Sequence, residues 1–280
     1  RTDEIRRNPP KPQDEMRAGL SYFNDTIFDG YPRFCKRIDT ALQNQGLPRI
    51  PLDHSIMRFS SWMGGDRDGN PNVTAECTRD VVYLARVTAV NLYFTEIQKL
   101  IFSLSMWRCS KTFGDRARGI LEEAGAHRAD SDVYEMRKRR NYSDFWRSIP
   151  IEEPYRVILA EVRDKLYNTR EMLQEVISGN RHALDTDDDS VIVSKEQLLE
   201  PLMACYDSLK EVGDLAVADG FLLDLIRQVH NFGMGLVKLD IRQESDRHAD
   251  AVDAITQHIG LGSYNEWDES KKTAFLVGEL

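Results

Sequence analysis

Apolar residues recur at helical spacing along most of the chain. Between about residues 75 and 108 they follow the i, i+3, i+4, i+7 pattern of an amphipathic helix, at Ile97, Leu100, Ile101 and Leu104. A second stripe begins after Pro154, and the pair Gly179-Asn180 predicts the end of that helix. Further helices are expected at about 14–27, up to about 45, 195–212, 217–230, 244–259 and 268–280. The pattern predicts a mainly α-helical chain.

Two regions depart from this pattern. Gly30 and Pro32 are expected to interrupt the first helical region, because proline lacks a backbone donor and clashes with the preceding turn. Residues 110–142 are polar and rich in charge, and the basic run 137–140 within them indicates solvated surface or a loop.

Only two segments have the character of β-strands, residues 55–62 and residues 235–242. The second segment alternates, with Val237, Leu239 and Ile241 on one face and Leu236, Lys238, Asp240 and Arg242 on the other. Charges on a strand face must pair with each other or face a polar ligand site. In α/β barrels the functional groups lie where strands end. The loops that follow these two segments are therefore the candidates for chemistry.

Composition narrows the class of function. The 280 residues carry a formal net charge of −9, with a pI near 5.3. This argues against nucleic-acid binding, which needs a basic face to neutralise phosphates. No apolar run approaches the roughly 20 residues of a membrane span.

The cysteines are widely spaced, form no CxxC pair and have no histidine at metal-ligand spacing. No metal site is predicted within the chain. The thiols are expected to be reduced and mostly buried, as suits a cytosolic protein: Cys35, Cys77, Cys109 and Cys205.

The loop after the first strand segment contains the run GGDRDGN, Gly64, Gly65, Asp66, Arg67, Asp68, Gly69 and Asn70. A calcium loop is excluded, because Pro71 and Cys77 occupy the positions where an EF-hand needs glycine and glutamate. A nucleotide-phosphate loop is excluded too, since neither GxxxxGK[ST] nor GxGxxG is present. Two alternatives remain. One is a purely structural turn in which glycines allow close backbone approach, and the other is a direct role in an anion site.

Arg242, at the end of the second segment, also has two interpretations. It could form a buried ion pair with Asp240, Glu244 or Asp246. It could instead clamp a phosphate or carboxylate, because a guanidinium group binds such anions in a forked geometry.

Several segments, in order along nearly the whole chain, resemble phosphoenolpyruvate carboxylase, especially its plant and algal members. The most specific are FSSWMGGDRDGNP at Phe59–Pro71 and LVKLDIRQES at Leu236–Ser245. The others are TDEIRR at Thr2–Arg7, PQDEMR at Pro12–Arg17, SMWRC at Ser105–Cys109, PYRVIL at Pro154–Leu159 and RDKLYNTR at Arg163–Arg170.

The resemblance implies a mainly α-helical α/β fold, part of a TIM-like barrel with many added helices and few strands. It implies a cytoplasmic lyase that joins bicarbonate to phosphoenolpyruvate with Mg²⁺ or Mn²⁺, giving oxaloacetate and phosphate through carboxyphosphate and the enolate of pyruvate. Such a path needs cationic groups for phosphate and enolate charge and a site closed to water. A homotetramer, no nucleic-acid partner and no membrane association are also expected.

Site residues follow from the same resemblance. Arg242 matches the family's substrate-side arginine at the end of a barrel strand. The loop Gly64–Asn70 is expected to shape the wall of this anion site, with Arg67 and Asp68 as its functional members. Arg6 and Arg156 match arginines that bind a hexose-phosphate activator, the alternative for each being a surface or interface salt bridge.

The family's catalytic histidine is expected before residue 1, and its catalytic lysine and metal-binding carboxylates after residue 280. Residues 1–280 are therefore expected to form a single partial domain, an internal fragment that is inactive alone. The alternatives are a non-enzymatic anion-binding regulatory module and a helical scaffold with structural charged loops.

Overall fold

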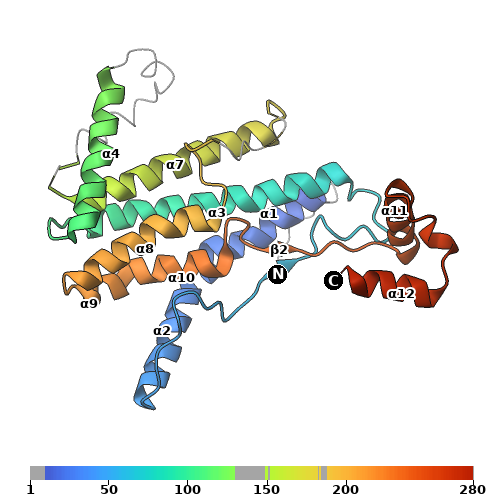
Figure 1. Cartoon of the computed structure of the whole chain (residues 1–280), viewed down its shortest axis with the longest axis horizontal. Helices are drawn as coiled ribbons and strands as arrows, with labels where there is room; N and C mark the ends of the chain where they lie inside the picture. The colour runs from blue at the N-terminus through green and yellow to red at the C-terminus, as the bar shows by residue number, and fades with distance from the viewer. Residues whose placement is uncertain (1–9, 130–148, 151, 182, 184–187, 280) are drawn as a thin grey trace, which may run out of the picture.

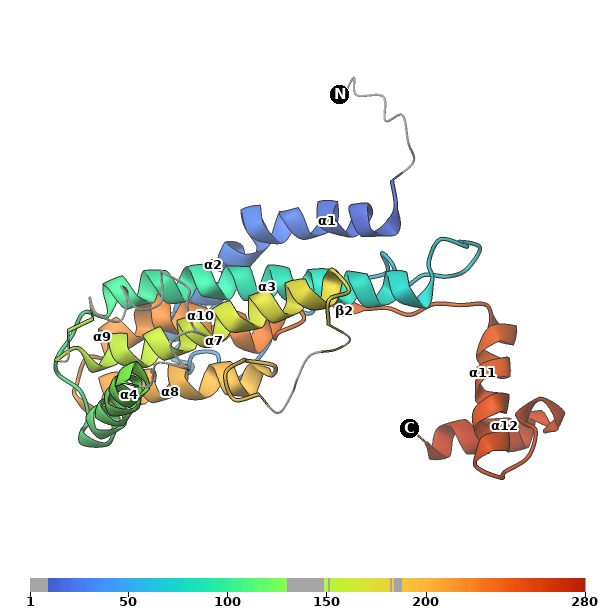
Figure 2. The same cartoon turned by 90° about the horizontal axis from the view of Figure 1, so that it is seen from above.

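Helices account for most of the computed structural model, which describes residues 10–129, 149–150, 152–181, 183 and 188–279. Figure 1 shows the helices arranged as an elongated bundle, and Figure 2 shows the same bundle from above. The elements in chain order are α1 (Pro12–Tyr22), the π-helical turn η1 (Phe23–Ile27), α2 (Phe28–Asn44), β1 (Ser60–Ser61), α3 (Ala75–Ser103), α4 (Lys111–Ala129), α7 (Pro154–Ile177), α8 (Lys195–Glu211), α9 (Leu215–Val217), the π-helical turn η2 (Ala218–Leu222), α10 (Leu223–Phe232), β2 (Lys238–Leu239), α11 (Ser245–His258), the 3-10 turn η3 (Tyr264–Glu266) and α12 (Glu269–Gly278).

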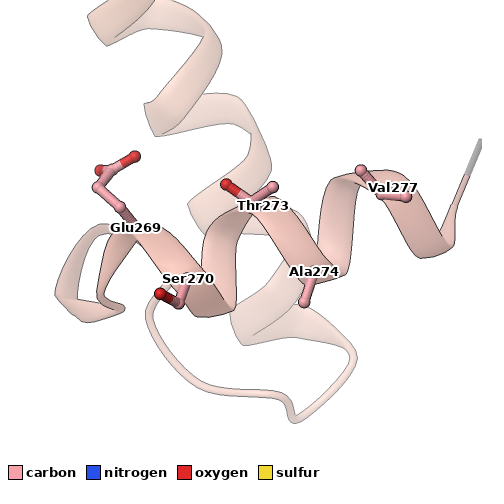
Figure 3. Close-up of a pocket in the computed structure, with 5 residues that line it drawn as sticks. All are labelled: Glu269, Ser270, Thr273, Ala274 and Val277. Carbon is pink, nitrogen blue, oxygen red and sulfur yellow. The ribbon is translucent and has the colours of Figure 1, made fainter.

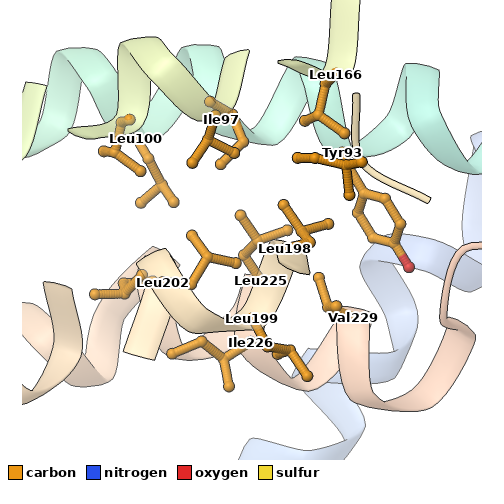
Figure 4. Close-up of a cluster of buried hydrophobic side chains, with 14 of the residues drawn as sticks. Tyr93, Ile97, Leu100, Leu166, Leu198, Leu199, Leu202, Leu225, Ile226 and Val229 are labelled. Atoms are coloured by element: carbon orange, nitrogen blue, oxygen red, sulfur yellow. The ribbon is translucent and has the colours of Figure 1, made fainter. Parts of the chain in front are cut away.

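The core lies around α3, which packs along α7 and also contacts α1 and α10. Figure 4 shows Tyr93, Ile97 and Leu100 of α3 facing side chains of α8 and α10, among them Leu202 and Leu225. Burying each such aliphatic side chain contributes about 1.5–3 kcal/mol relative to leaving it in water. The predicted helical stripe is therefore confirmed as the centre of the core.

Helix α2 runs through Gly30 and Pro32, so the expected interruption there is wrong. Pro32 has no N–H to donate to the carbonyl of Phe28, one turn earlier. Instead, the buried side chain of Gln228 on α10 donates to Phe28 O at 2.8 Å, which satisfies the carbonyl that proline leaves free. The irregularity falls earlier, at η1.

Helix α4 occupies part of the polar stretch for which the sequence predicted no helix. The basic run 137–140 lies outside the described residues. Helix α7 begins at Pro154 and ends at Ile177, and Gly179 after it has a φ of +78°, so the predicted stop is confirmed. The cysteines are free thiols, and Cys35, Cys77 and Cys205 are buried as expected, while Cys109 is half-buried.

Both predicted strands are present but short. β1 and β2 pair in parallel, with Ser60 opposite Lys238 and Ser61 opposite Leu239. Pairing is interrupted because the chain turns after β1, where the amides of Gly65 and Asp66 both donate to Trp62 O at 2.9 Å. On the predicted apolar face Val237 and Leu239 are half-buried, while Ile241 at its end is 52% exposed.

Helices α11 and α12 lie apart from the bundle, beyond β2, in both views (Figures 1 and 2). Large apolar side chains on and next to them are exposed: Ile255, Ile259, Leu261, Leu276 and Val277. Within the described residues, no helix is both long and apolar enough to cross a membrane.

Candidate functional site

The loop after β1 and the segment after β2 meet at the same end of the parallel pair. The amide of Arg242 donates to Gly65 O at 3.0 Å, and the amide of Arg67 donates to Arg242 O at 2.9 Å. Asp66 and Arg242 form an isolated parallel bridge. The structure therefore brings the two sequence-predicted arginines, Arg67 and Arg242, onto hydrogen-bonded backbone segments.

Glycines make this approach possible. A Cβ atom on Gly65 would overlap the carbonyl oxygen of Asp240, so β2 could not lie where it does against any other residue. Gly64 has a φ of +78°, and a Cβ there would meet a methyl group of Val81 on α3. The close backbone approach expected of this glycine pair is thus present.

The rest of the loop is a pair of side-chain-capped turns. Asp66 Oδ1 accepts from the amide of Asp68 at 3.3 Å, and Asn70 Oδ1 accepts from the amide of Asn72 at 3.0 Å. Asp68, Gly69 and Asn70 are exposed at the tip. Asp66 and Asn70 therefore shape the loop through their carboxylate and amide oxygens.

Arg67 is half-buried between the loop and α3. Its Nη2 donates to Thr78 Oγ1 at 3.2 Å, and Thr78 Oγ1 donates in turn to Gly64 O at 2.8 Å. Among the described residues, Arg67 Nε is buried without a hydrogen-bond partner, and no carboxylate lies within ion-pair distance. Burial and Asp80 raise the pKa of the neighbouring Cys77 thiol, while the charge of Arg67 partly opposes this. The loop therefore holds a positive charge that no described carboxylate neutralises.

Arg242 projects toward solvent beside Arg67's loop. Its Nη2 lies 3.3 Å from Asp240 Oδ2, and its guanidinium carbon lies 5.6 Å from the centre of the Trp62 ring. The side chains of Arg242 and Asp240 are 52% and 40% exposed, so the ion pair is not the buried one that the sequence allowed. An exposed pair of this kind contributes about 0–1 kcal/mol and leaves the arginine available to an anion.

Sequence reasoning missed two residues of this site. Trp62 lies under the guanidinium group of Arg242, and Thr78 connects Arg67 to the loop backbone. Trp62 lies two residues before the glycine run, so its position carried a signal. Thr78 comes from the next helix, and only the packing of α3 on the loop brings it to Arg67.

The predicted activator site is divided. Arg6 lies outside the described residues. Arg156, in the first turn of α7, donates from Nε to Ile101 O at 2.7 Å and pairs through Nη1 with Glu153 at 2.8 Å. Its side chain is 19% exposed. These contacts correspond to the salt-bridge alternative, and they fix the guanidinium group at the junction of α3 and α7.

In the part of the chain that the structure describes, a metal-ligand cluster or a pocket with opposing polar groups would be an alternative to the strand ends. The described residues contain no group of three or more His, Cys, Asp or Glu side chains placed to hold a metal ion, so they do not fit a divalent-metal centre. The pocket in Figure 3 is lined by residues of α12 alone, from Glu269 to Val277. A hollow formed on one helix supplies no opposing catalytic group.

Comparison with known proteins gives a consistent result. The family model for phosphoenolpyruvate carboxylase matches residues 1–280. The chain is 54% identical over 281 residues to phosphoenolpyruvate carboxylase 2 of Arabidopsis thaliana, covering 100% of this chain and 28% of that protein. It is 54% identical over 284 residues to phosphoenolpyruvate carboxylase 1 of Chlamydomonas reinhardtii, covering 100% of this chain and 29% of that protein. The chain thus spans less than a third of the length of these relatives.

Proposed function

Because this chain belongs to the phosphoenolpyruvate carboxylase family, we propose that it is a segment of an enzyme that carboxylates phosphoenolpyruvate with bicarbonate. A bicarbonate oxygen attacks the phosphorus, the bond from phosphorus to the enol oxygen breaks, and carboxyphosphate and the enolate of pyruvate form. The carboxyl carbon then bonds to the methylene carbon of the enolate. Phosphate leaves, and oxaloacetate is the product.

One observation carries the assignment of this segment to the substrate site. Arg67 and Arg242 lie on adjacent, hydrogen-bonded backbone segments at the ends of two parallel strands. Among the described residues, neither forms an ion pair with a buried carboxylate. Two guanidinium groups at one strand end suit a substrate that carries both a phosphate and a carboxylate. We assign Arg242 to the substrate anion and Arg67 to the wall of the same site.

Arg242 is exposed enough to turn toward a ligand, with Trp62 beneath it as an aromatic platform. As the phosphorus–oxygen bond breaks, negative charge moves onto the enol oxygen. A guanidinium group close to that oxygen stabilises the charge more in the transition state than in the substrate, which is what accelerates the step. The loop Gly64–Asn70, with Asp68 at its exposed tip, limits access of water to the developing enolate.

The strand pair is consistent with part of a TIM-like barrel, since parallel neighbours joined by long helical connections are the building unit of that fold. In this proposal residues 1–280 form one partial domain. The catalytic histidine, the catalytic lysine and the ligands of Mg²⁺ or Mn²⁺ come from the rest of the enzyme. The metal would polarise phosphate and enolate oxygens there. We also propose that the full-length enzyme is cytoplasmic and forms a homo-oligomer.

The test uses the full-length carboxylase with Arg242→Ala and Arg242→Lys. We expect kcat/KM for phosphoenolpyruvate to fall about 10²–10³-fold in the alanine variant, as when one transition-state donor is removed. Lysine should restore only part of this, because it cannot bind in a forked geometry. Arg33→Ala, an exposed arginine on α2, is the matched control and should behave as wild type. Wild-type kinetics for Arg242→Ala would refute the assignment and favour a non-enzymatic or scaffold role for these loops.

A regulatory anion site is a second proposal, resting on the matches of Arg6 and Arg156. The guanidinium group of Arg156 is already bonded to Ile101 O and paired with Glu153, so a phosphate would have to displace the Glu153 carboxylate to bind there. Including Arg156→Gln in the same set of variants, assayed with and without a hexose phosphate, tests it through the activation ratio.

A further inference from the structure

The backbone just before β2 is strained at Leu236. This residue has a φ of +62° and is the only non-glycine residue with positive φ among the described residues. The amide of Val237 donates to Gly235 O at 2.7 Å, which closes a γ-turn around Leu236. The positive-φ form of this turn is the rare and strained one. A bulky side chain in this conformation is a true outlier and persists only where its surroundings force it.

Two contacts hold the chain around Leu236 in this conformation. The Leu236 side chain is 2% exposed and belongs to the hydrophobic core. Three residues earlier, Gly233 ends α10 with a φ of +55°, and its carbonyl oxygen accepts from the hydroxyl of Tyr93 at 2.7 Å. Tyr93 is itself fully buried in α3. The connection from α10 to β2 is therefore fixed to the core at both of its ends.

The path from this turn to the site is short. Immediately after Leu236, the amide of Lys238 donates to Phe59 O at 3.0 Å and the amide of Asp240 donates to Ser61 O at 2.8 Å. The next link is the pair of hydrogen bonds between Arg242 and the loop at Gly65 and Arg67. Because β2 has only two strand residues, few bonds besides these hold its register against β1.

We propose that Leu236 is a positioning residue for Arg242. The buried leucine side chain and the hydrogen bond from the Tyr93 hydroxyl to Gly233 O together hold the γ-turn. The turn then sets the direction and register of β2. This places the backbone of Arg242 against the loop that carries Arg67. The inference rests on the proposed function of Arg242 as a substrate ligand.

The experiment uses two matched pairs in the full-length carboxylase. Tyr93→Phe removes the hydroxyl that holds Gly233, and Tyr155→Phe removes an equally buried hydroxyl that bonds Ser208, away from β2. Leu236→Ala removes the buried side chain before β2, and Leu209→Ala removes one from the core at α8. The readouts are kcat, KM for phosphoenolpyruvate, thermal unfolding, and hydrogen–deuterium exchange of a peptide covering residues 236–243 without substrate.

We expect Tyr93→Phe and Leu236→Ala to raise KM about tenfold and to speed exchange in residues 236–243, because small misplacements of binding groups cost up to about 100-fold. Their partners should change thermal unfolding without changing KM or that exchange. Leu236→Met should restore KM, since it refills the space at similar volume. If Leu236→Ala does not fold, the two tyrosine variants decide the question alone.

Unchanged KM and unchanged exchange in Tyr93→Phe would overturn the inference. Faster exchange with normal KM would overturn it as well, because β2 could then move without harming the site. Arg242→Ala, measured in parallel, separates this from a failure of the proposed function. If that variant retains catalysis, the assignment of Arg242 is wrong, whatever the exchange data show.

Discussion

Gly65 is the residue at which the two halves of the candidate site touch. Its missing side chain leaves room for the carbonyl of Asp240, and two residues later the backbone of Arg67 reaches Arg242. The glycine pair in the sequence predicted a close backbone approach, and that prediction is confirmed. The local pattern did not pair this loop with its partner segment, which lies on a strand far along the chain, and only the family resemblance placed the two in one site.

Gly65→Ala in the full-length protein should separate the two segments. The new methyl group would overlap a backbone oxygen, which cannot rotate away as a side chain can, so β2 must shift. We expect a loss of about 1–3 kcal/mol in the free energy of unfolding, together with a marked fall in kcat/KM.

The control is Gly119→Ala in α4, where an added Cβ meets nothing within 4 Å. Alanine there should raise stability by about 0.4–1 kcal/mol, because it restricts the unfolded chain. If Gly65→Ala is as active and stable as wild type, the two strand ends do not approach as described here.

Individual helices show what local pattern can and cannot predict. Helix α7 matches its predicted stripe and stop, since both signals lie within the helix itself. The continuity of α2 through Pro32 was not predictable, because the group that satisfies Phe28 O lies 200 residues further along the chain. Helix α4 was missed because charged and polar residues dominate its sequence, although Phe113, Ala117, Ile120 and Leu121 fall at the i, i+4, i+7, i+8 spacing of a core-facing stripe.

Gln228→Leu tests the role of that distant donor in α2. The substitution leaves the buried carbonyl of Phe28 without a partner, which should cost about 1–3 kcal/mol in the free energy of unfolding. Denaturant unfolding of the full-length protein measures this loss. Gln174→Leu, at an exposed position on α7, should change stability by less than about 0.5 kcal/mol. Equal stability of the two variants would mean that Phe28 O is satisfied in another way.

At the scale of the whole molecule, the described residues leave apolar surface uncovered. The exposed side chains of α11 and α12 lie just beyond the candidate site, and β2 pairs only with β1 in the described part of the chain. The curated relatives are more than three times as long as this chain, since it covers 28% of the first of them. Surface of this kind is expected to be covered by parts of the full-length protein that lie outside this chain.

Ile255→Lys combined with Ile259→Lys on α11 makes that expectation testable, because these side chains are 58% and 56% exposed in the segment. In the isolated 280-residue chain, which should show no oxaloacetate formation, the double variant should bind less hydrophobic dye and aggregate less than the parent chain. In the full-length enzyme the same substitutions should lower thermal stability, because each buried isoleucine contributes about 1.5–3 kcal/mol and a buried lysine costs more. Less aggregation of the isolated chain together with lower thermal stability of the full-length enzyme would show that this face of α11 is covered in the whole protein. If the full-length enzyme tolerates both lysines without loss, α11 faces water in the whole molecule, and the uncovered surface belongs to the native protein rather than to the segment.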